Sequence, residues 1–470
     1  MTAVTATARW AASQKVGQTL RTPRAAVTVA KQPTGFARAF HGSAATFRAT
    51  VPKSALGRGL AATRRGFVTA GLVVGTLAGS AYLWDSRAAI YPYVVMPALR
   101  LFDAEDTHAF SIQLAKWGLV PRDTSRDQPE PALETKLWGK TVVNPLGLAA
   151  GYDKNGEAID AMYGLGFGLV EVGSITPAPQ PGNPRPRVFR LPEEKACINR
   201  YGFNSQGHEA TRQRLVDRFW RKAIANQPGT DDETTAAAQV PVEQQYRSGV
   251  PGRLLGINLG KNTNSPQDSY DDYVRGVQAF GALADYLVVN VSCPNTPGQR
   301  DQQKGDKLEQ LLKQVVSERD QLEGHRPPLV VKISPDLSEA ELTQIAQASL
   351  KARVDGIIVS NTTTQRPRGL HASSAVLHER GGLSGPPVQD LSLQALKTVY
   401  RLTRGEIPLI GCGGIGSGAD ALRFARAGAS AVQIYTSMSY DGPGVPRRIK
   451  DEVVQLLEGQ KWSSVVGKDA

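Results

Sequence analysis

Amide, hydroxyl and lysine side chains recur along the chain, each close to the end of a short apolar run. Lys154 follows such a run in the segment AAGYDK, Asn290 ends another, and Asn361 follows a third. These groups bind anions and both donate and accept hydrogen bonds, so they suit a flat, anionic heteroaromatic ligand. Asp153 is the one carboxylate among them, which leaves glycoside or metal-dependent hydrolysis without its acid pair or ligand set.

Three cysteines, Cys197, Cys293 and Cys412, are far apart in the sequence and form no CxxC pair. A zinc site and an iron–sulfur cluster therefore both lack their usual ligands, and a disulfide framework is unsupported. We expect no metal site. Any redox chemistry then needs a bound organic cofactor.

The glycine-rich segment from Gly411 to Gly416 (GCGGIG) matches the GxGxxG pattern of dinucleotide-binding folds. Such a site also needs an acidic residue about 20 positions further on, at the end of the next strand. The chain reads AVQIYTS there, without an acid. We therefore interpret the segment as a phosphate-binding loop, completed by backbone N–H groups at Tyr435 and Thr436, which favours FMN over NAD.

A regular framework must bring these residues together, and the sequence alternates strand-like and helix-like segments from about residue 140. The expected strands are 142–149, 168–172, 254–259, 286–291, 329–333, 356–360, 407–412 and 431–435. Eight such units predict an α/β fold of the (β/α)8 TIM barrel type over residues 130–465, with a doubly wound open sheet as the alternative. In a barrel, active-site residues gather where the strands end.

Two regions interrupt this alternation of strands and helices. Residues 226–251 are rich in Gln, Thr, Ala and Gly, so we expect a flexible surface insertion. Residues 365–382 form a second long connection on the side where barrel loops build active sites, and a role as a lid is possible there.

The positive charge of the chain is concentrated at its N-terminus. The formal net charge is +12, and residues 1–84 contain eleven lysines and arginines but no acidic residue. An acid-free start rich in Arg, Ser, Thr and Ala is typical of a mitochondrial transit peptide, with a disordered basic tail as the alternative. We assign residues 1–65 to this leader. Because the remaining chain is nearly neutral, we expect no nucleic-acid partner.

Residues 66–84 form an uncharged segment of 19 residues. At 1.5 Å per residue this length comes close to the roughly 30 Å hydrocarbon core of a bilayer. Arg64 and Arg65 precede the segment, and Tyr82 and Trp84 suit the interface at its other end. We predict one transmembrane helix, with a buried core helix as the alternative. If the basic flank stays in the matrix, the following domain faces the intermembrane space.

Residues 85–125 are expected to form a small helical subdomain. The stretch 88–102 is apolar nearly all round and is interrupted by Pro92 and Pro97, and Asp103 is the expected N-cap of a second helix. Three large apolar residues recur along that helix at i, i+4 and i+7: Phe110, Leu114 and Trp117. Such helices either lie at the lipid boundary and admit an apolar ligand or cap the barrel, and the sequence does not separate the two.

Linked motifs in a fixed order resemble the dihydroorotate dehydrogenase family. They include NPLGLAAGYDKNGE, EVGSITP, INRYGFNSQG, GINLGKN, LVVNVSCPNTPG, VKISPDL, GGLSGPP, GCGGIGSG and QIYTS. The leader, the apolar span and the helices after it resemble the membrane-bound class of the mitochondrial inner membrane. The resemblance implies oxidation of (S)-dihydroorotate to orotate in pyrimidine (UMP) biosynthesis, with bound FMN and with ubiquinone as electron acceptor.

The resemblance also implies roles for individual residues. FMN would be held by Ala149, Ala150, Gly151, Ser174, Asn258, Asn290, Lys332, Ser360, Gly385, Gly414, Tyr435 and Thr436. Dihydroorotate or orotate would be held by Lys154, Asn199, Tyr201, Gly202, Phe203, Asn290, Asn295, Asn361 and Thr362. The quinone tunnel would be lined by His108 and Arg190. Lys332 would offset the negative charge that develops near N1 of the reduced flavin.

Cys293 departs from the pattern of the membrane-bound class, in which the base that removes the C5 proton is usually Ser. Cys is typical of the soluble, fumarate-using class. We expect Cys293 to be the base, because a thiol with a pKa of about 8.5 ionises more readily than a hydroxyl. The alternative is a small buried apolar residue. Competing functions are a soluble fumarate-linked enzyme and a membrane-tethered binding protein without activity.

Overall fold

A computed structural model describes residues 53–125, 130–225, 246–296, 298–303 and 305–470. Most of the predicted leader and most of the predicted insertion therefore lie outside the described residues. The chain divides into two compact units, Met1–Val68 and Thr69–Ala470. All predicted site residues belong to the second unit, and the description below concerns that unit unless stated otherwise.

Eight parallel strands close into a barrel. They are β3 (Leu146–Leu148), β4 (Leu169–Ile175), β7 (Leu254–Leu259), β8 (Tyr286–Asn290), β9 (Leu329–Ile333), β10 (Gly356–Val359), β12 (Leu409–Cys412) and β13 (Ala429–Ile434). The last strand, β13, pairs with the first, β3, which completes the ring. The (β/α)8 barrel prediction is thereby confirmed, and the open sheet is excluded.

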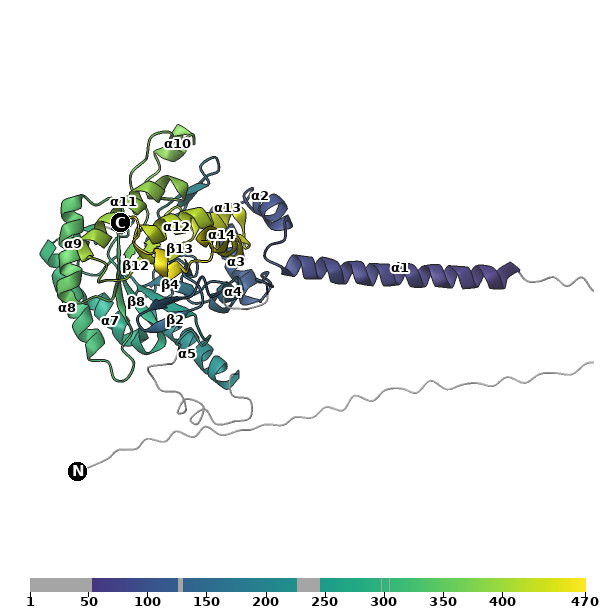
Figure 1. The fold of residues 1–470 in the computed structure, drawn as a ribbon, viewed down its shortest axis with the longest axis horizontal. Helices are drawn as coiled ribbons and strands as arrows, with labels where there is room; N and C mark the ends of the chain where they lie inside the picture. Colours follow the sequence, from purple (N-terminus) through teal and green to yellow (C-terminus); the bar gives the residue numbers. More distant parts are fainter. Residues whose placement is uncertain (1–52, 126–129, 226–245, 297, 304) are drawn as a thin grey trace, which may run out of the picture. The chain divides into compact units, whose positions relative to one another are not determined.

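The barrel strands are apolar on both faces because helices cover the outside and side chains fill the inside. All residues of β7, β8 and β9 are buried, for example. The covering helices are α4 (Ile159–Gly164), α5 (Gly207–Ala225), α7 (Asp271–Phe280), α8 (Gly305–Asp320), α9 (Glu339–Ala352), α11 (Gln389–Thr403), α12 (Gly418–Arg426) and α14 (Val445–Leu457). Figure 1 shows α8 and α9 side by side on the outside of the barrel.

Shorter elements complete the fold. They are the 3-10 helices η3 (Gly281–Leu283), η4 (Gln299–Gln303) and η5 (Pro386–Val388), and the helices α10 (Ser374–Leu377), α13 (Thr436–Asp441) and α15 (Trp462–Val465). Residues 246–251, the described end of the predicted insertion, form a turn in which Ser248 is fully buried. Its hydroxyl donates to the carbonyl oxygens of Val250 and Arg253. Ser248 is thus packed against the fold, and the flexibility of the insertion stays a prediction.

The first predicted strand, 142–149, was too long. Val142 ends β2 (Lys140–Val142), which forms an antiparallel hairpin with β1 (Thr135–Leu137), and the barrel strand starts only at Leu146. Val143, Asn144 and Pro145 separate the two strands. Pro145 has no N–H to donate, and the Asn144 side chain accepts from the N–H of Leu146, so the chain turns here.

A three-stranded antiparallel sheet beside the barrel was not predicted. It consists of β5 (Val188–Leu191), β6 (Ala196–Asn199) and β11 (Gly382–Ser384), in the order β11-β6-β5. Arg190 lies on β5, and Asn199 ends β6 opposite Gly382. The sheet therefore carries two predicted site residues, and it ties the 365–382 connection to the chain between β4 and α5.

The first helix, α1 (Lys53–Trp84), contains the predicted span. Its segment Phe67–Trp84 has a mean hydropathy of 1.5, is long and apolar enough to cross a membrane, and has none of its residues buried. The helix begins earlier than predicted, within the segment that was assigned to the leader.

A helical run follows, made of the π-helix η1 (Tyr91–Val95) and α2 (Met96–Leu99). Pro92 and Pro97 do not interrupt it, contrary to the prediction. Each lies in the first two positions of its element, where a missing N–H costs little, and the N–H of Met96 bonds to Tyr91 O across the wider π turn.

The next helix, α3 (Ala104–Lys116), begins where the sequence predicted. The Asp103 side chain accepts from the N–H groups of Glu105 and Asp106, so its role as N-cap is confirmed. Phe110 and Trp117 remain 50% and 61% exposed, whereas Leu114 lines a cavity. One face of α3 thus covers the protein interior, and another presents apolar side chains outward.

Candidate active site

A single cavity of about 630 Å³ joins the barrel rim to the helices before the barrel. At the rim it is lined by residues at the ends of β3, β4, β8, β9, β10, β12 and β13. At its other end it is lined by η1, α2 and α3, through residues such as Val95, Leu99 and Leu114. The cavity is therefore polar where the strands end and apolar between the helices.

Every predicted site residue except Asn258 lines this cavity. Asn258 lies within β7, and its side chain contacts its neighbours. Its Oδ1 accepts from the Ser174 hydroxyl and from Asn290 Nδ2 at 3.2 Å, and its Nδ2 donates to Glu171 Oε1 at 2.8 Å. Asn258 thus holds two cavity-lining side chains in place, and the expectation that it reaches a ligand directly is not supported by this arrangement.

Four asparagine amides gather at the polar end of the cavity, from β6, β8, the loop after β8 and the loop after β10. Asn361 Nδ2 lies 3.4 Å from Asn290 Oδ1, and Asn295 Nδ2 lies 3.4 Å from Asn199 Oδ1. Hydrogen bonds of this length are weak. Asn290 Nδ2 and Asn361 Nδ2 also donate to Ser174 Oγ and Ser292 Oγ, both at 3.0 Å. A ligand ring with alternating N–H and C=O groups would share or exchange these bonds with the amides.

Cys293 lies on the loop after β8 and is 7% exposed. Burial raises the pKa of its thiol, while the N–H of Asn295, the Thr296 hydroxyl and the positive charge of Arg300 act in the opposite direction. Thr296 Oγ1 lies 3.6 Å from Sγ. The thiol is therefore protonated at neutral pH, and a role as base becomes stronger as the pH rises.

Lys154 reaches the same end of the cavity from the loop after β3. Its Nζ donates to Gly151 O at 2.8 Å and lies 4.2 Å from the centre of the Tyr201 ring. Loss of water and the nearby Arg187 guanidinium lower its pKa to about 8. Among the described residues no carboxylate forms an ion pair with Lys154. The ammonium group is suited to receive an anionic ligand.

Glycines shape the opposite end of the rim, where a phosphate group was predicted. Gly385 and Gly414 both have positive φ, at +98° and +70°. A Cβ on Gly414 would lie 2.8 Å from Gln389 Cβ and 2.9 Å from Gly385 O, so the backbones come too close for a side chain. This arrangement fits the close backbone approach that a phosphate requires.

Gln433 on β13 lines the cavity and was missed by the sequence analysis. Its Nε2 donates to Glu171 Oε2 at 2.6 Å, whereas its buried Oε1 has no hydrogen-bond partner among the described residues. An N–H of a planar ring would satisfy that oxygen. The alternation of side chains along a strand could have identified Gln433 as a cavity residue. Gln433 lies two residues before Tyr435 and therefore points to the same side of the strand. A flavin ring fits this donor and acceptor set.

His108 and Arg190 lie at the junction with the helices. His108 Nε2 bonds to Tyr152 O at 2.8 Å, and burial together with the charge of Lys154 lowers its pKa to about 4, so the imidazole is neutral. Arg190 donates to Phe102 O and to Thr107 Oγ1, both at 2.6 Å. Arg190 therefore fastens the α2–α3 turn to β5 and also contributes to the cavity wall.

Tyr152 was not predicted, yet its ring lies between His108 and Tyr435, with ring centres 5.2 Å and 6.2 Å away. Its hydroxyl donates to Ser111 Oγ at 3.0 Å, and the Ser111 hydroxyl donates to His108 O at 2.7 Å. These bonds connect α3 to the loop after β3 at the point where the cavity changes from apolar to polar.

Comparisons with known proteins agree with this geometry. The family model described as dihydroorotate dehydrogenase matches residues 132–457. A curated relative from Eremothecium gossypii, named dihydroorotate dehydrogenase (quinone), mitochondrial, is 48% identical and covers 86% of this chain and 90% of its own length. The relative of the same name from Mus musculus is 48% identical and covers 80% of this chain and 88% of its own length.

A solved structure gives the same result. The crystal structure of DHODH in complex with ferulenol from Eimeria tenella is 40% identical to this chain, with a TM-score of 0.70. It covers 78% of this chain and 96% of the solved chain. The similarity therefore extends over the barrel and beyond it.

Proposed function

The chain belongs to the dihydroorotate dehydrogenase family, and from this we propose that it oxidises (S)-dihydroorotate to orotate with bound FMN and passes the electrons to ubiquinone. It is an oxidoreductase, and the reaction is a step of pyrimidine (UMP) biosynthesis. The observation that carries the proposal is the single cavity, which joins a polar end with a thiol and a lysine to an apolar end between helices.

The polar end supports binding and deprotonation of dihydroorotate. Lys154 would pair with the substrate carboxylate, and the four asparagine amides would bond to the ring. Tyr201, Gly202, Phe203 and Thr362 would close the remaining sides. Cys293 would take the C5 proton in its thiolate form, whose formation is opposed by burial and favoured by Arg300.

The residues around the flavin position would hold the cofactor without a covalent bond. Gly151 and the Gly385–Gly414 pair permit close backbone approach, Gln433 Oε1 offers an acceptor, and Lys332 offers a buried cation. When bound, FMN supplies the acceptor for the hydride from C6 and the route for two electrons to the quinone. Lys332 would favour the negative charge of the reduced state.

The apolar end supports access for a quinone. Side chains of η1, α2 and α3 line the cavity. Large apolar side chains are exposed on these elements and in the turns that follow them: Tyr93, Leu101, Phe102, Phe110 and Trp117. A surface of this kind would lie in the lipid boundary next to the Phe67–Trp84 span. We therefore place the protein in the mitochondrial inner membrane as a single-pass protein, with the barrel in the intermembrane space by the positive-inside rule.

Spectroscopy of the purified full chain tests the flavin and the acceptor. We expect a visible flavin spectrum that bleaches when dihydroorotate is added without oxygen and returns when a short-tailed ubiquinone analogue follows. Fumarate should not restore it. A colourless protein would support the binding-protein alternative. Full turnover with fumarate after removal of residues 1–102 would support the soluble class.

Substitution of the thiol tests the base. Cys293→Ala should slow flavin reduction by dihydroorotate at neutral pH by about 100-fold or more, the usual contribution of a positioned base. Cys293→Ser should retain activity only with its pH profile moved upward, because a hydroxyl ionises less readily than a thiol. Near-full reduction of FMN in the Ala variant would rule out Cys293 as the base.

A further inference from the structure

An ion pair beside the cavity connects the loop after β8 with the loop after β9. Arg300, from the loop that also carries Cys293, places Nη1 2.8 Å from Asp336 Oδ2. The two side chains are 26% and 12% exposed, so the pair is largely shielded from solvent. Neither residue belongs to the predicted substrate or cofactor contacts, and loop charges are ordinarily solvated.

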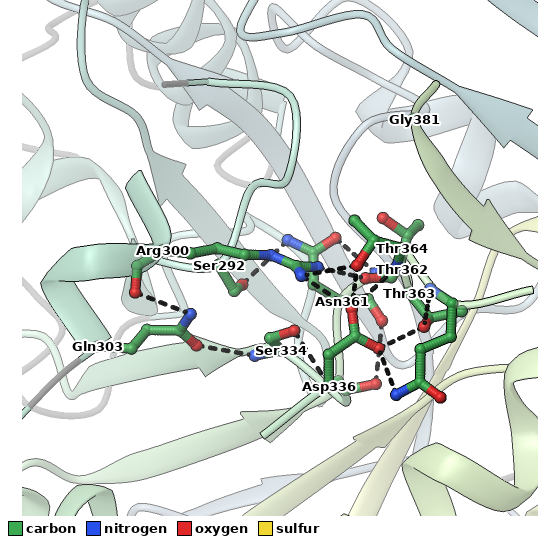
Figure 2. Close-up of polar contacts among 12 residues, drawn as sticks. Ser292, Arg300, Gln303, Ser334, Asp336, Asn361, Thr362, Thr363, Thr364 and Gly381 are labelled. Carbon is green, nitrogen blue, oxygen red and sulfur yellow. Dashed lines mark hydrogen bonds and ion pairs between the residues drawn. The ribbon is translucent and has the colours of Figure 1, made fainter. Parts of the chain in front are cut away.

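The same pair also holds the loop after β10 (Figure 2). Arg300 Nη2 donates to Thr362 O at 3.1 Å, and Asp336 accepts from the N–H of Thr364 at 2.8 Å and from the Thr363 hydroxyl. The segment that carries two expected substrate residues, Asn361 and Thr362, is thus bonded by both members of the pair. Three adjacent strand-end loops meet at this point.

Two further contacts fix the loop after β8 on either side of Arg300. Before it, Asn361 Nδ2 donates to Ser292 Oγ at 3.0 Å, next to Cys293. After it, Gln303 Oε1 accepts from the N–H of Ser334 at 2.9 Å. Figure 2 shows both contacts together with the Arg300 side chain. The position of the thiol therefore depends on contacts between loops rather than on β8 alone.

We propose that Arg300, paired with Asp336, is a positioning residue that fixes the thiol of Cys293 against the substrate-binding strand ends. The inference rests on the proposed function and extends it to two residues that do not line the cavity. Arg300 also acts through its charge. It favours the thiolate, as does Lys154 on the loop after β3, and Asp336 neutralises part of the Arg300 charge.

Removing the positive charge of Arg300 and removing the negative charge of Asp336 should shift the pH profile in opposite directions. A purely structural role would not produce such opposite shifts. Arg300→Gln removes a cation near the thiol, so the pH profile of flavin reduction by dihydroorotate should move upward, with a loss of about tenfold at pH 7. This loss should recover only in part toward alkaline pH, because the variant also lacks the guanidinium contacts to Asp336 and Thr362. Asp336→Asn leaves the Arg300 charge uncompensated, so the profile should move downward. Both variants should bind orotate more weakly, because the loop after β10 loses contacts.

Arg300→Lys is the matched control. It keeps the positive charge but loses the forked geometry that bonds Asp336 and Thr362 together. We expect a pH profile close to that of the unchanged protein, with a lower maximal rate and weaker orotate binding. The readout is stopped-flow flavin absorbance between pH 6 and 10, with orotate affinity from the flavin spectrum.

The outcomes distinguish this inference from the proposed function. If the unchanged protein has no flavin or is not reduced by dihydroorotate, the proposed function fails. If it is reduced normally, but Arg300→Gln and Asp336→Asn show equal losses at every pH, or no loss, the positioning role is refuted.

Discussion

Binding of orotate should become weaker and should take up protons as the pH rises from 6.5 to 8.5, and Lys154 is the reason. Burial and the Arg187 guanidinium lower its pKa to about 8. The ammonium form is then about 97% populated at pH 6.5 but only about 24% populated at pH 8.5. A bound carboxylate favours the charged form, so the pKa of Lys154 should return to its ordinary value of about 10.4 or higher in the complex.

The size of the effect follows from these populations. Between pH 6.5 and 8.5 the Kd for orotate should rise about fourfold, because the competent ammonium form becomes scarce. At pH 8.5 each binding event should take up roughly 0.75 proton, and at pH 6.5 almost none. Cys293 contributes little in this range, since its pKa is raised by burial and the thiol stays protonated.

Titration calorimetry of the flavin-containing protein measures both quantities. Binding enthalpies at pH 8.5 in two buffers with different ionisation enthalpies give the number of protons taken up. Lys154→Met is the control, since it keeps the length and apolar character of the side chain but cannot ionise. It should bind orotate weakly and without proton uptake. Equal affinity at both pH values, or equal proton uptake in the Met variant, would refute the reasoning.

Two further variants test other parts of the structure. Tyr152→Phe removes a hydroxyl that donates to Ser111. A hydrogen bond of about 1 kcal/mol corresponds to a roughly fivefold change, and stopped-flow spectroscopy should show flavin reoxidation by a quinone analogue slowed more than reduction by dihydroorotate. Gly256→Ala would place a Cβ 2.2 Å from Cζ of the buried Tyr286 ring. The substitution should lower the free energy of unfolding by about 1–3 kcal/mol, and an unchanged thermal unfolding midpoint would contradict this.

The barrel could be predicted from the sequence because its strands are covered on both faces. Such strands appear as continuous apolar runs, and β7 and β9 were placed with both ends correct, at Leu254–Leu259 and Leu329–Ile333. The first strand failed because Val142 belongs to a separate hairpin and the turn at Asn144 is short. The sheet of β5, β6 and β11 was missed because its strands have three or four residues each and pair across a long stretch of sequence.

The cavity residues could be predicted because strand ends in a barrel meet at one rim. Their roles came from the family resemblance and remain proposals. Asn258 is the predicted site residue that does not line the cavity. It lies within its strand, and its side chain bonds to Ser174 and Asn290. The Arg300–Asp336 pair could not be predicted, since the two residues lie in different loops and a charge in a loop is ordinarily solvated. Only the order of strands around the barrel brings them together.

A cysteine base is compatible with a quinone acceptor because different parts of the chain determine the two properties. The thiolate is favoured by Arg300 and opposed by burial, and both effects arise in the strand-end loops. Access for an apolar acceptor would depend on η1, α2 and α3, and Arg190 fastens the α2–α3 turn to β5. The charge that acts directly on the thiol, Arg300, belongs to the loop after β8 and not to these helices. In the proposed function, the acceptor is therefore better indicated by the helices before the barrel than by the residue type at position 293.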